Sequence, residues 1–314
     1  MGKEVLAWGG FIAFILMMLA LDLGVFQRKS HEIKVKESLL LMGFWISLAL
    51  LFNLGIYVTR GPRPALEFLT GYLIEESLSI DNIFVFLMIF SYFSVPAFVQ
   101  RKALVWGILG AILLRAIFIS TGLTLIHKFH WLLYLFGGLL VWTGIKMVSA
   151  PEKQIEPEKN PVIRLFRKFV PATKDYEGDK FFVKRAGQYF ATPLLAVLLV
   201  VETTDLIFAI DSIPAVFGIT LDPFIVYTSN IFAILGLRAL YFALAGMMKR
   251  FHYLSYGLSV ILIFIGAKML FSHFFLIPIH IALCIVAGVL VFSVVLSLIF
   301  PGPSRFGKLK KTKI

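Results

Sequence analysis

Cysteine and charge are scarce in this sequence. Its 314 residues include a single cysteine, Cys284, so the chain can form neither an internal disulfide nor a thiolate cluster around a metal. Charged residues make up 15% of the chain and hydrophobic residues 59%, whereas soluble domains average about 25% and roughly 45–50%. These proportions exclude a soluble protein and predict an all-α, polytopic membrane protein with the lipid bilayer as its partner.

The net charge of +12 would suggest nucleic acid in a soluble protein. No motif here interleaves aromatic and basic residues as RNA- and DNA-binding modules do. We therefore expect no nucleic-acid partner and assign the basic residues to loops on one side of a membrane.

Nine apolar segments are long enough, at about 20 residues each, to cross a bilayer as helices. They cover residues 6–23, 38–58, 65–95, 103–121, 131–148, 192–219, 224–247, 254–271 and 277–299. Loops and tail on one side hold 22 Lys and Arg residues, and those on the other side hold 4. The asymmetry predicts a multi-pass protein of the cytoplasmic (inner) membrane, with its N-terminus outside and its C-terminus in the cytoplasm.

Three stretches recur in the same order in the two halves of the chain. SIDNI (79–83) matches AIDSI (209–213), LLRAIF (113–118) matches LGLRALYF (235–242), and YLFGGLLVWTGIKM (134–147) matches YGLSVILIFIGAKM (256–269). This register places Glu75 on Asp205 and Arg115 on Arg238. Each repeat has three helices, an odd number, so the sequence predicts two inverted-topology repeats, whose binding sites lie near the bilayer midplane in many transporters.

The repeats define the expected organisation. Residues 1–64 form two leading helices, 65–148 the first repeat, 149–191 a cytoplasmic connector, 192–271 the second repeat, and 272–314 a last helix with a basic tail.

Carboxylates interrupt the third and sixth apolar segments. Each acid at the centre of a membrane helix costs roughly 2.5–3.5 kcal/mol on insertion scales, and two arginines cannot neutralise five or six acids. The predicted metal ligands are oxygen donors of these two segments: Glu75, Asp81, Asn82, Glu202, Asp205, Asp211 and Ser212. Supporting roles are expected for Glu76, Arg115, Arg238 and Asp22.

The spacing of the acids carries a geometric prediction. Asp211 lies six residues after Asp205, which turns it away by about 120° on a straight helix. Both acids can therefore reach one ion only if the helix is unwound or the ion lies close to the helix axis. Pro214, which cannot donate to the carbonyl of Ile210, favours a break in the helix. Such hard oxygen ligands suit Mn²⁺, Mg²⁺ or Ca²⁺, and a carboxylate cluster is also compatible with exchange against protons.

At EESLSIDNIFVF and VETTDLIFAIDSIPAVFGIT the sequence resembles the TerC/Alx family of integral membrane proteins, which is grouped with LysE-type exporters. The resemblance covers nearly the whole chain, including GQYFATPLL and LGLRALYFALAGMMKRFHYLSYGLSVILIFIGAKML. It implies manganese efflux, metal supply to exported proteins or tellurium resistance. The family's acidic positions fall here on Glu75, Asp81, Glu202, Asp205 and Asp211.

Two other functions remain open. A membrane scaffold could deliver metal to exported proteins or act in a tellurium-resistance complex, with residues 149–191 as its docking segment. An embedded Mg²⁺-dependent transferase could use the acids to hold metal, but it would need more basic residues near them and a nucleophile. We therefore expect a transporter and no enzyme.

Overall fold

The structure is a computed structural model of the chain. It describes residues 2–24, 35–149, 171–245 (except 172, 174 and 186), 253–274 and 277–300. Within these ranges it does not describe the side chains of residues 2–4, 6, 21–24, 35, 81, 84, 97, 98, 149 and 245.

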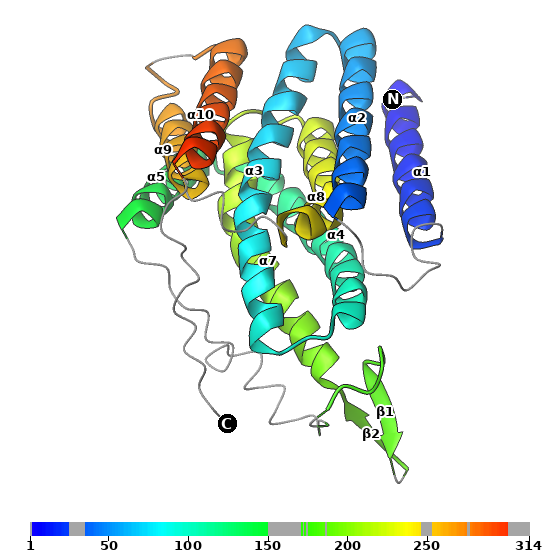
Figure 1. Cartoon of the computed structure of the whole chain (residues 1–314). Helices are drawn as coiled ribbons and strands as arrows, with labels where there is room; N and C mark the ends of the chain where they lie inside the picture. The colour runs from blue at the N-terminus through cyan, green and yellow to red at the C-terminus, as the bar shows by residue number, and fades with distance from the viewer. Residues whose placement is uncertain are drawn as a thin grey trace. The chain divides into compact units, whose positions relative to one another are not determined.

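Helices dominate the described residues (Figure 1). They are α1 (Gly2–Gly24), α2 (Val35–Arg60), α3 (Pro62–Tyr92), α4 (Ala97–Lys128), α5 (Leu132–Ser149), α7 (Pro193–Phe217), α8 (Pro223–Ala245), α9 (Leu254–Leu270) and α10 (Ile279–Ile299). Each predicted span falls on one of them, so the all-α membrane fold is confirmed.

Five helices are long and apolar enough to cross a membrane, judged on the described residues. They cover Lys36–Arg60, Val99–Lys128, Pro193–Phe217, Pro223–Leu244 and Ile279–Ile299. Helices α1, α5 and α9 supply shorter apolar stretches. The total of nine spans stays a prediction.

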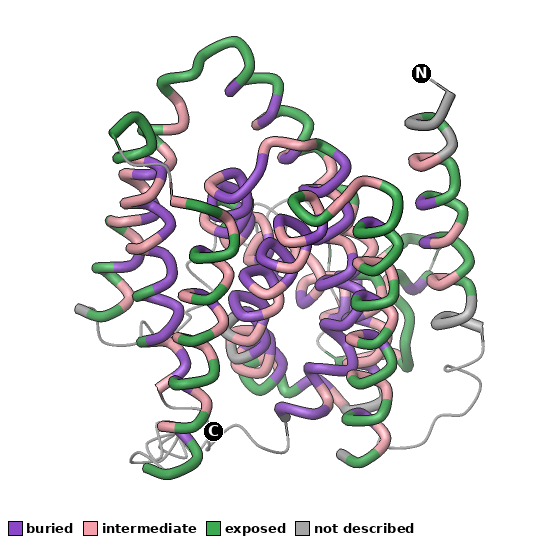
Figure 2. Tube along the Cα trace, turned by 90° about the horizontal axis from the view of Figure 1, so that it is seen from above, coloured by how far each residue is buried: buried purple, intermediate pink, exposed green. Residues whose placement is uncertain are grey.

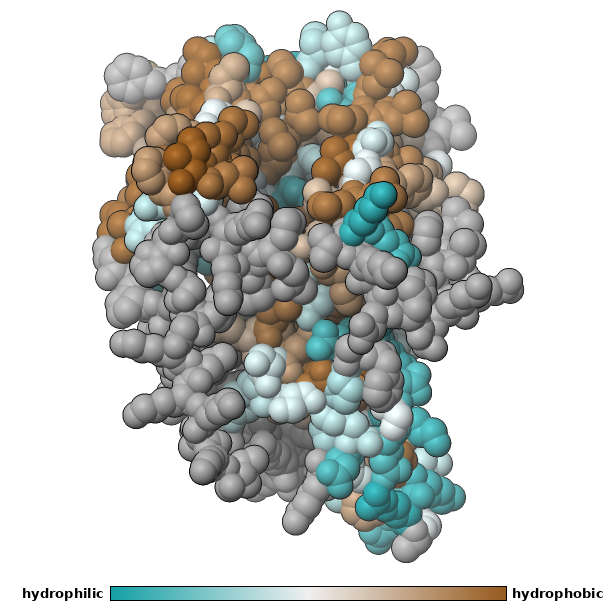
Figure 3. Space-filling model, in the orientation of Figure 1, coloured by the Kyte–Doolittle hydropathy of each residue, from teal (hydrophilic) through white to brown (hydrophobic). Residues whose placement is uncertain are grey.

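Residues 1–33 form one compact unit and residues 34–314 another. In the first, α1 is a 23-residue apolar helix. In the second, α3 packs against α2, α7 and α8, while α4 packs against α7 and α8. Along these helices buried and exposed residues alternate in stripes (Figure 2). Hydrophilic side chains gather over the hairpin that precedes α7 (Figure 3).

The helices that the sequence register treats as equivalent lie in contact: α3 with α7, α4 with α8, and α5 with α9. The cross pairs α3–α8 and α4–α7 are also in contact. A two-fold relation between the repeats would give this pattern, although the inverted repeat itself stays a prediction.

Glycines let α5 and α9 approach closely. A Cβ on Gly266 would lie 2.6 Å from the carbonyl oxygen of Gly137, and a Cβ on Gly144 would lie 2.8 Å from that of Ser259. Small residues at such crossings are typical of helix pairs in membranes. Gly144 and Gly266 are the glycines that the repeat register aligns.

Helix α7 corrects one expectation. It begins with Pro193 in its first turn and runs unbroken to Phe217, with Pro214 inside it. Proline removes one hydrogen bond from the ladder, but it lies only three residues before the end of the helix. The predicted break near Pro214 is therefore wrong.

A two-stranded antiparallel hairpin precedes α7 and was not predicted. Strands β1 (Phe182–Arg185) and β2 (Gln188–Ala191) pair from Phe182 opposite Ala191 to Arg185 opposite Gln188. Tyr176 donates to the carbonyl of Phe93 at 2.9 Å. The end of the connector is thus tied to the end of α3.

Candidate ion site around Arg115

A buried arginine, Arg115, lies among polar side chains of α3, α7 and α8. Arg115 on α4 is 2% exposed, Glu75 on α3 is fully buried, and Asp205 on α7 is 2% exposed. We call Arg115, Glu75, Asp205, Ser212 and Asn230 the Arg115 cluster. It joins two helices from the first half of the chain, α3 and α4, to two from the second half, α7 and α8.

The guanidinium of Arg115 contacts every other member of the cluster. Its Nη1 forms an ion pair with Glu75 Oε1 and donates to Asn230 Oδ1 at 3.0 Å and to Ser212 Oγ at 3.4 Å. Its Nη2 lies 3.3 Å from Asp205 Oδ1, and its Nε donates to Asp205 Oδ2 at 3.4 Å. One fixed positive charge thus serves two carboxylates.

The cluster carries an excess of acceptors. Glu75 Oε2 is buried and has no hydrogen-bond partner in the described part of the chain. Burying an unsatisfied carboxylate oxygen is costly unless a cation or proton satisfies it. With both acids ionised, the cluster has a net charge of −1 and an unfilled acceptor.

Glu202 lies one helical turn from Asp205 on the same face of α7. Its carboxyl group packs against the backbone of Gly110 on α4, in the space that a Cβ there would occupy. Its Oε2 is buried without a hydrogen-bond partner among the described residues. Gly110 on α4 therefore makes room for a third acidic side chain, that of Glu202, beside the two acids of the Arg115 cluster.

Glu76 points elsewhere, as expected of the residue next to Glu75. Its carboxyl oxygens lie near Gly236 on α8, where Trp45 on α2 is also close. Within the described residues, Glu76 Oε2 is buried and has no hydrogen-bond partner. Glu76 is thus a separate acid between α2, α3 and α8.

Asp211 is not brought to the guanidinium of Arg115. Its Oδ1 accepts a hydrogen bond of 3.0 Å from Thr143 Oγ1 on α5, and Lys146 acts on it electrostatically. Because α7 stays helical, Asp205 faces Arg115 while Asp211 faces α5. The expectation that a broken helix would aim both acids at one centre is wrong, and a ligand role for Asp211 stays a prediction.

Two further predicted site residues, Asn82 and Arg238, are buried in the bundle. Asn82 is 3% exposed on α3, and Arg238 is 6% exposed on α8 and has interaction partners. The side chains of Asp81 and Asp22 lie outside the described part of the structure. Among the described side chains, no three His, Cys, Asp or Glu residues form a group that could hold a metal ion.

Asn230 was missed from the sequence. It lies in α8 within the stretch YTSNIF, where an amide in an apolar helix signals a hydrogen bond between helices. It is fully buried. The register that aligns Arg115 with Arg238 places it opposite Gly107 of the first repeat.

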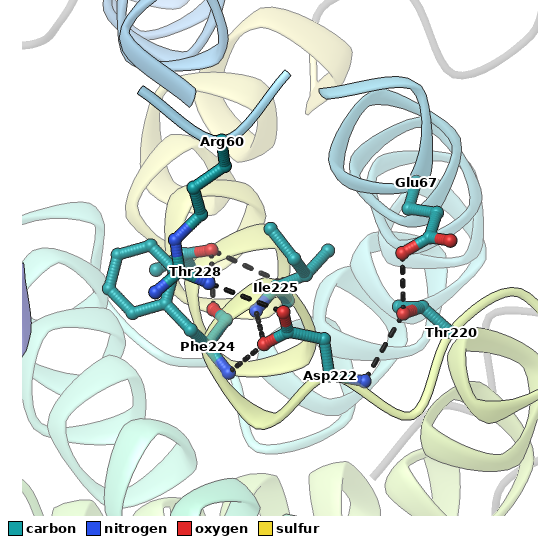
Figure 4. A network of polar contacts seen from close by, with 7 residues as sticks. All are labelled: Arg60, Glu67, Thr220, Asp222, Phe224, Ile225 and Thr228. Carbon is teal, nitrogen blue, oxygen red and sulfur yellow. Dashed lines mark hydrogen bonds and ion pairs between the residues drawn. The ribbon is translucent and has the colours of Figure 1, made fainter. Parts of the chain in front are cut away.

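A second polar network closes the end of the bundle formed by the α2–α3 and α7–α8 loops (Figure 4). Arg60 Nη1 lies 3.2 Å from Asp222 Oδ2, and its guanidinium stacks 4.2 Å from the ring centre of Phe224. Thr220 Oγ1 donates to Glu67 Oε2 at 2.7 Å. This network ties the start of α3 to the loop that leads into α8.

Comparison with known proteins places the chain in a family. Residues 60–304 match the Integral membrane protein TerC family. The chain is 52% identical over 292 residues to "Uncharacterized membrane protein STKORF319" of Myxococcus xanthus, covering 93% of this chain and 92% of the relative. It is 50% identical over 301 residues to "Putative membrane-bound redox modulator Alx" of Shigella flexneri, covering 93% and 94%.

A more distant relative, "Uncharacterized membrane protein" of Rickettsia bellii, is 43% identical over 294 residues, or 94% of this chain and 97% of the relative. No solved structure matches the chain significantly. The family match covers most of the chain and includes every residue of the Arg115 cluster. The chain therefore belongs to the TerC family of integral membrane proteins.

Proposed function

We propose that this protein transports a divalent metal cation, and that it exports Mn²⁺ from the cytoplasm. The observation that supports this is the Arg115 cluster, in which two buried carboxylates share one arginine and Glu75 keeps an unfilled oxygen. Such groups inside a membrane are expensive and mark ion paths.

Glu75 and Asp205 would hold the cation, with Ser212 and Glu202 as further oxygen donors. Their ligand atoms are hard oxygens, which suit Mn²⁺, Mg²⁺ and Ca²⁺. Asp81, Asn82 and Asp211 remain proposed ligands on the same two helices. Mn²⁺ is chosen over the other two ions by the resemblance to the TerC/Alx family.

Arg115 would act as a tethered counter-ion. In the structure its guanidinium pairs with both Glu75 and Asp205 and offsets half of their charge, so an arriving cation must displace it from at least one of them. When the cation leaves, the guanidinium returns and prevents two buried carboxylates from repelling each other. Exchange of the cation against protons is compatible with this cycle.

The first test is Mn²⁺ flux into proteoliposomes containing the purified protein. Wild type should transport Mn²⁺, and Asp205→Asn should lose transport at least ten-fold while keeping its fold. The matched control is Leu113→Phe, which lies on α4 and is 63% exposed, so it should leave flux unchanged. A folded wild type without flux in either direction would contradict the proposal.

The name of the Shigella relative raises a redox role as an alternative. Thiol chemistry within this chain is limited to Cys284, since the sequence has no second cysteine for an internal disulfide. Cys284 lies on α10 and is exposed. These facts favour transport over a thiol-based redox function.

A further inference from the structure

A small cavity lies against Asp205, between α3, α4, α7 and α8, with room for about one water molecule. Its wall includes Phe86, Leu104, Gly107, Ala111, Asp205 and Leu237. Among the described residues that line the cavity, Asp205 is the only charged one. The cavity therefore adjoins the Arg115 cluster at one of its two acids.

All four helices place this cavity on the connector side of the cluster. On α3, Phe86 lies eleven residues beyond Glu75 toward the loop at Pro96, and on α8, Leu237 lies seven residues beyond Asn230. On α4, Leu104 and Ala111 precede Arg115 in a helix that begins at that same loop. Glu202 lies on this side too, one turn of α7 closer to the connector.

An apolar plug separates the cavity from the connector. Phe90 and Tyr241 pack with ring centres 5.6 Å apart, and both belong to the apolar cluster that also contains Phe86, Leu104 and Leu237 of the cavity wall. Tyr241 donates to Gln100 Oε1 at 3.0 Å, and Gln100 Nε2 donates to the carbonyl of Val95 at 2.9 Å. Phe90 and Tyr241 are each 2% exposed, and they lie one helical turn beyond Phe86 and Leu237 toward the connector end of α3 and α8.

We propose that the cavity is the inner end of the cation's path between the connector side of the membrane and Asp205, and that Phe90 and Tyr241 are its gate. This inference rests on the proposed cation transport. Glu202, with its free carboxylate oxygen, would be the first charged group that a hydrated divalent cation meets beyond the gate. Gly107 and Gly110 have no side chains, so α4 leaves room for the path to widen when Phe90 and Tyr241 move apart.

The single native cysteine makes a direct test possible. In a Cys284→Ser background, Ala111→Cys places a thiol in the cavity wall with little change in volume, and Leu104→Cys provides a second position. A small, positively charged methanethiosulfonate reagent is added to sealed vesicles of either orientation. Lys180→Cys, at an exposed connector position, reports which side of the vesicle membrane carries the connector. Leu113→Cys is the unreactive control, because Leu113 lies on the exposed face of the membrane-spanning helix α4, where a thiol faces lipid and a charged reagent does not reach it.

We expect both cavity thiols to react from the connector side only, at least five-fold more slowly when Mn²⁺ is present. Adding Tyr241→Phe, which removes the hydrogen bond to Gln100, should speed the reaction at residue 111. No reaction at either position, or reaction only from the opposite side, would overturn the inference, as would labelling that Mn²⁺ does not slow. Failure of the proposed function would show separately, as absent Mn²⁺ flux in unlabelled wild type.

Discussion

Glu75 on α3 and Asp205 on α7 contact the same guanidinium, that of Arg115 on α4. They are also the two acids that the internal sequence register aligns. A single arginine between aligned acids neutralises half of their charge and fixes three helices around one point. This arrangement predicts how the protein responds to changes at that point and around it.

Removal of the Arg115 guanidinium should lower the stability of the fold. Arg115→Met leaves Glu75 and Asp205 buried and unpaired, which typically destabilises a protein by about 3–5 kcal/mol. Arg115→Lys keeps the charge but loses the forked geometry, so it should lower the stability less than Arg115→Met does. Thermal unfolding in detergent measures both.

The comparison variant for that series is Arg63→Met. Arg63 pairs with Glu67 through a side chain that is 83% exposed, and exposed pairs contribute about 0–1 kcal/mol. Equal stability losses at Arg63 and Arg115 would contradict the central role of the cluster.

Gly110 should be required for the position of Glu202. In Gly110→Ala the new methyl group would occupy the site of the Glu202 carboxyl, so Glu202 must move and Mn²⁺ flux should fall several-fold. Gly138→Ala on α5 is the control, because nothing lies within 4 Å of its new Cβ. If the two variants transport equally, Glu202 has no part in the path.

The α5–α9 crossing should depend on the absence of side chains. Gly266→Val would drive a branched side chain into the carbonyl of Gly137 and into Val141, and overpacking of this kind costs about 1–3 kcal/mol or more. Gly43→Val on α2 meets open space and should have little effect. The difference in melting temperature between the two variants checks this packing.

Asp222 should stabilise the start of α8 in two ways. Its Oδ1 accepts from the backbone N–H groups of Phe224 at 2.9 Å and Ile225 at 3.3 Å, while its Oδ2 pairs with Arg60. Asp222→Ala removes both and should cost about 1–2 kcal/mol, whereas Asp222→Asn should lose less because an amide oxygen still caps the helix. An equal loss for both variants in thermal unfolding would show that the cap contributes little.

The connector should loosen in acid. A hydrogen bond from Lys102 and its charge hold the pKa of Asp179 below its ordinary value. The lowered pKa means that this pair stabilises the fold above the unfolded pKa of about 3.9 and loses that contribution as the pH falls through the folded value. Because the pair is exposed, the effect should stay below about 1 kcal/mol.

Limited proteolysis with a protease active at both pH values tests this contact. Cleavage near residues 175–180 should increase below about pH 4 in wild type, and Lys102→Met should already show the increase at pH 7. Cleavage that is unchanged by either acid or Lys102→Met would contradict it.

The helices could be predicted because long apolar runs have one stable arrangement in a bilayer. The partnership of Arg115 with Glu75 and Asp205 was also within reach, since the register paired the acids and only two buried arginines stood among the aligned motifs. The direction in which Asp211 points could not be predicted from the sequence. It depends on whether α7 breaks at Pro214, and the packing around the helix decides that.

The hairpin before α7 was missed because its strands are short and lie in a polar, charged connector. One local signal was present: Gly187, with φ of +83°, lies in the two-residue loop between Arg185 and Gln188. Glycine in such a loop is typical of tight hairpins.

The measurement that tests the proposed site most directly is calorimetric titration of Mn²⁺ into purified wild type and into Glu75→Gln, with Mg²⁺ and Ca²⁺ as competitors. Glu75→Gln retains the size of the side chain and removes the charge that faces Arg115. We predict that wild type binds Mn²⁺ and that Glu75→Gln weakens binding at least ten-fold with the fold intact. Equal binding by the two proteins would contradict the assignment of the cation to the Arg115 cluster.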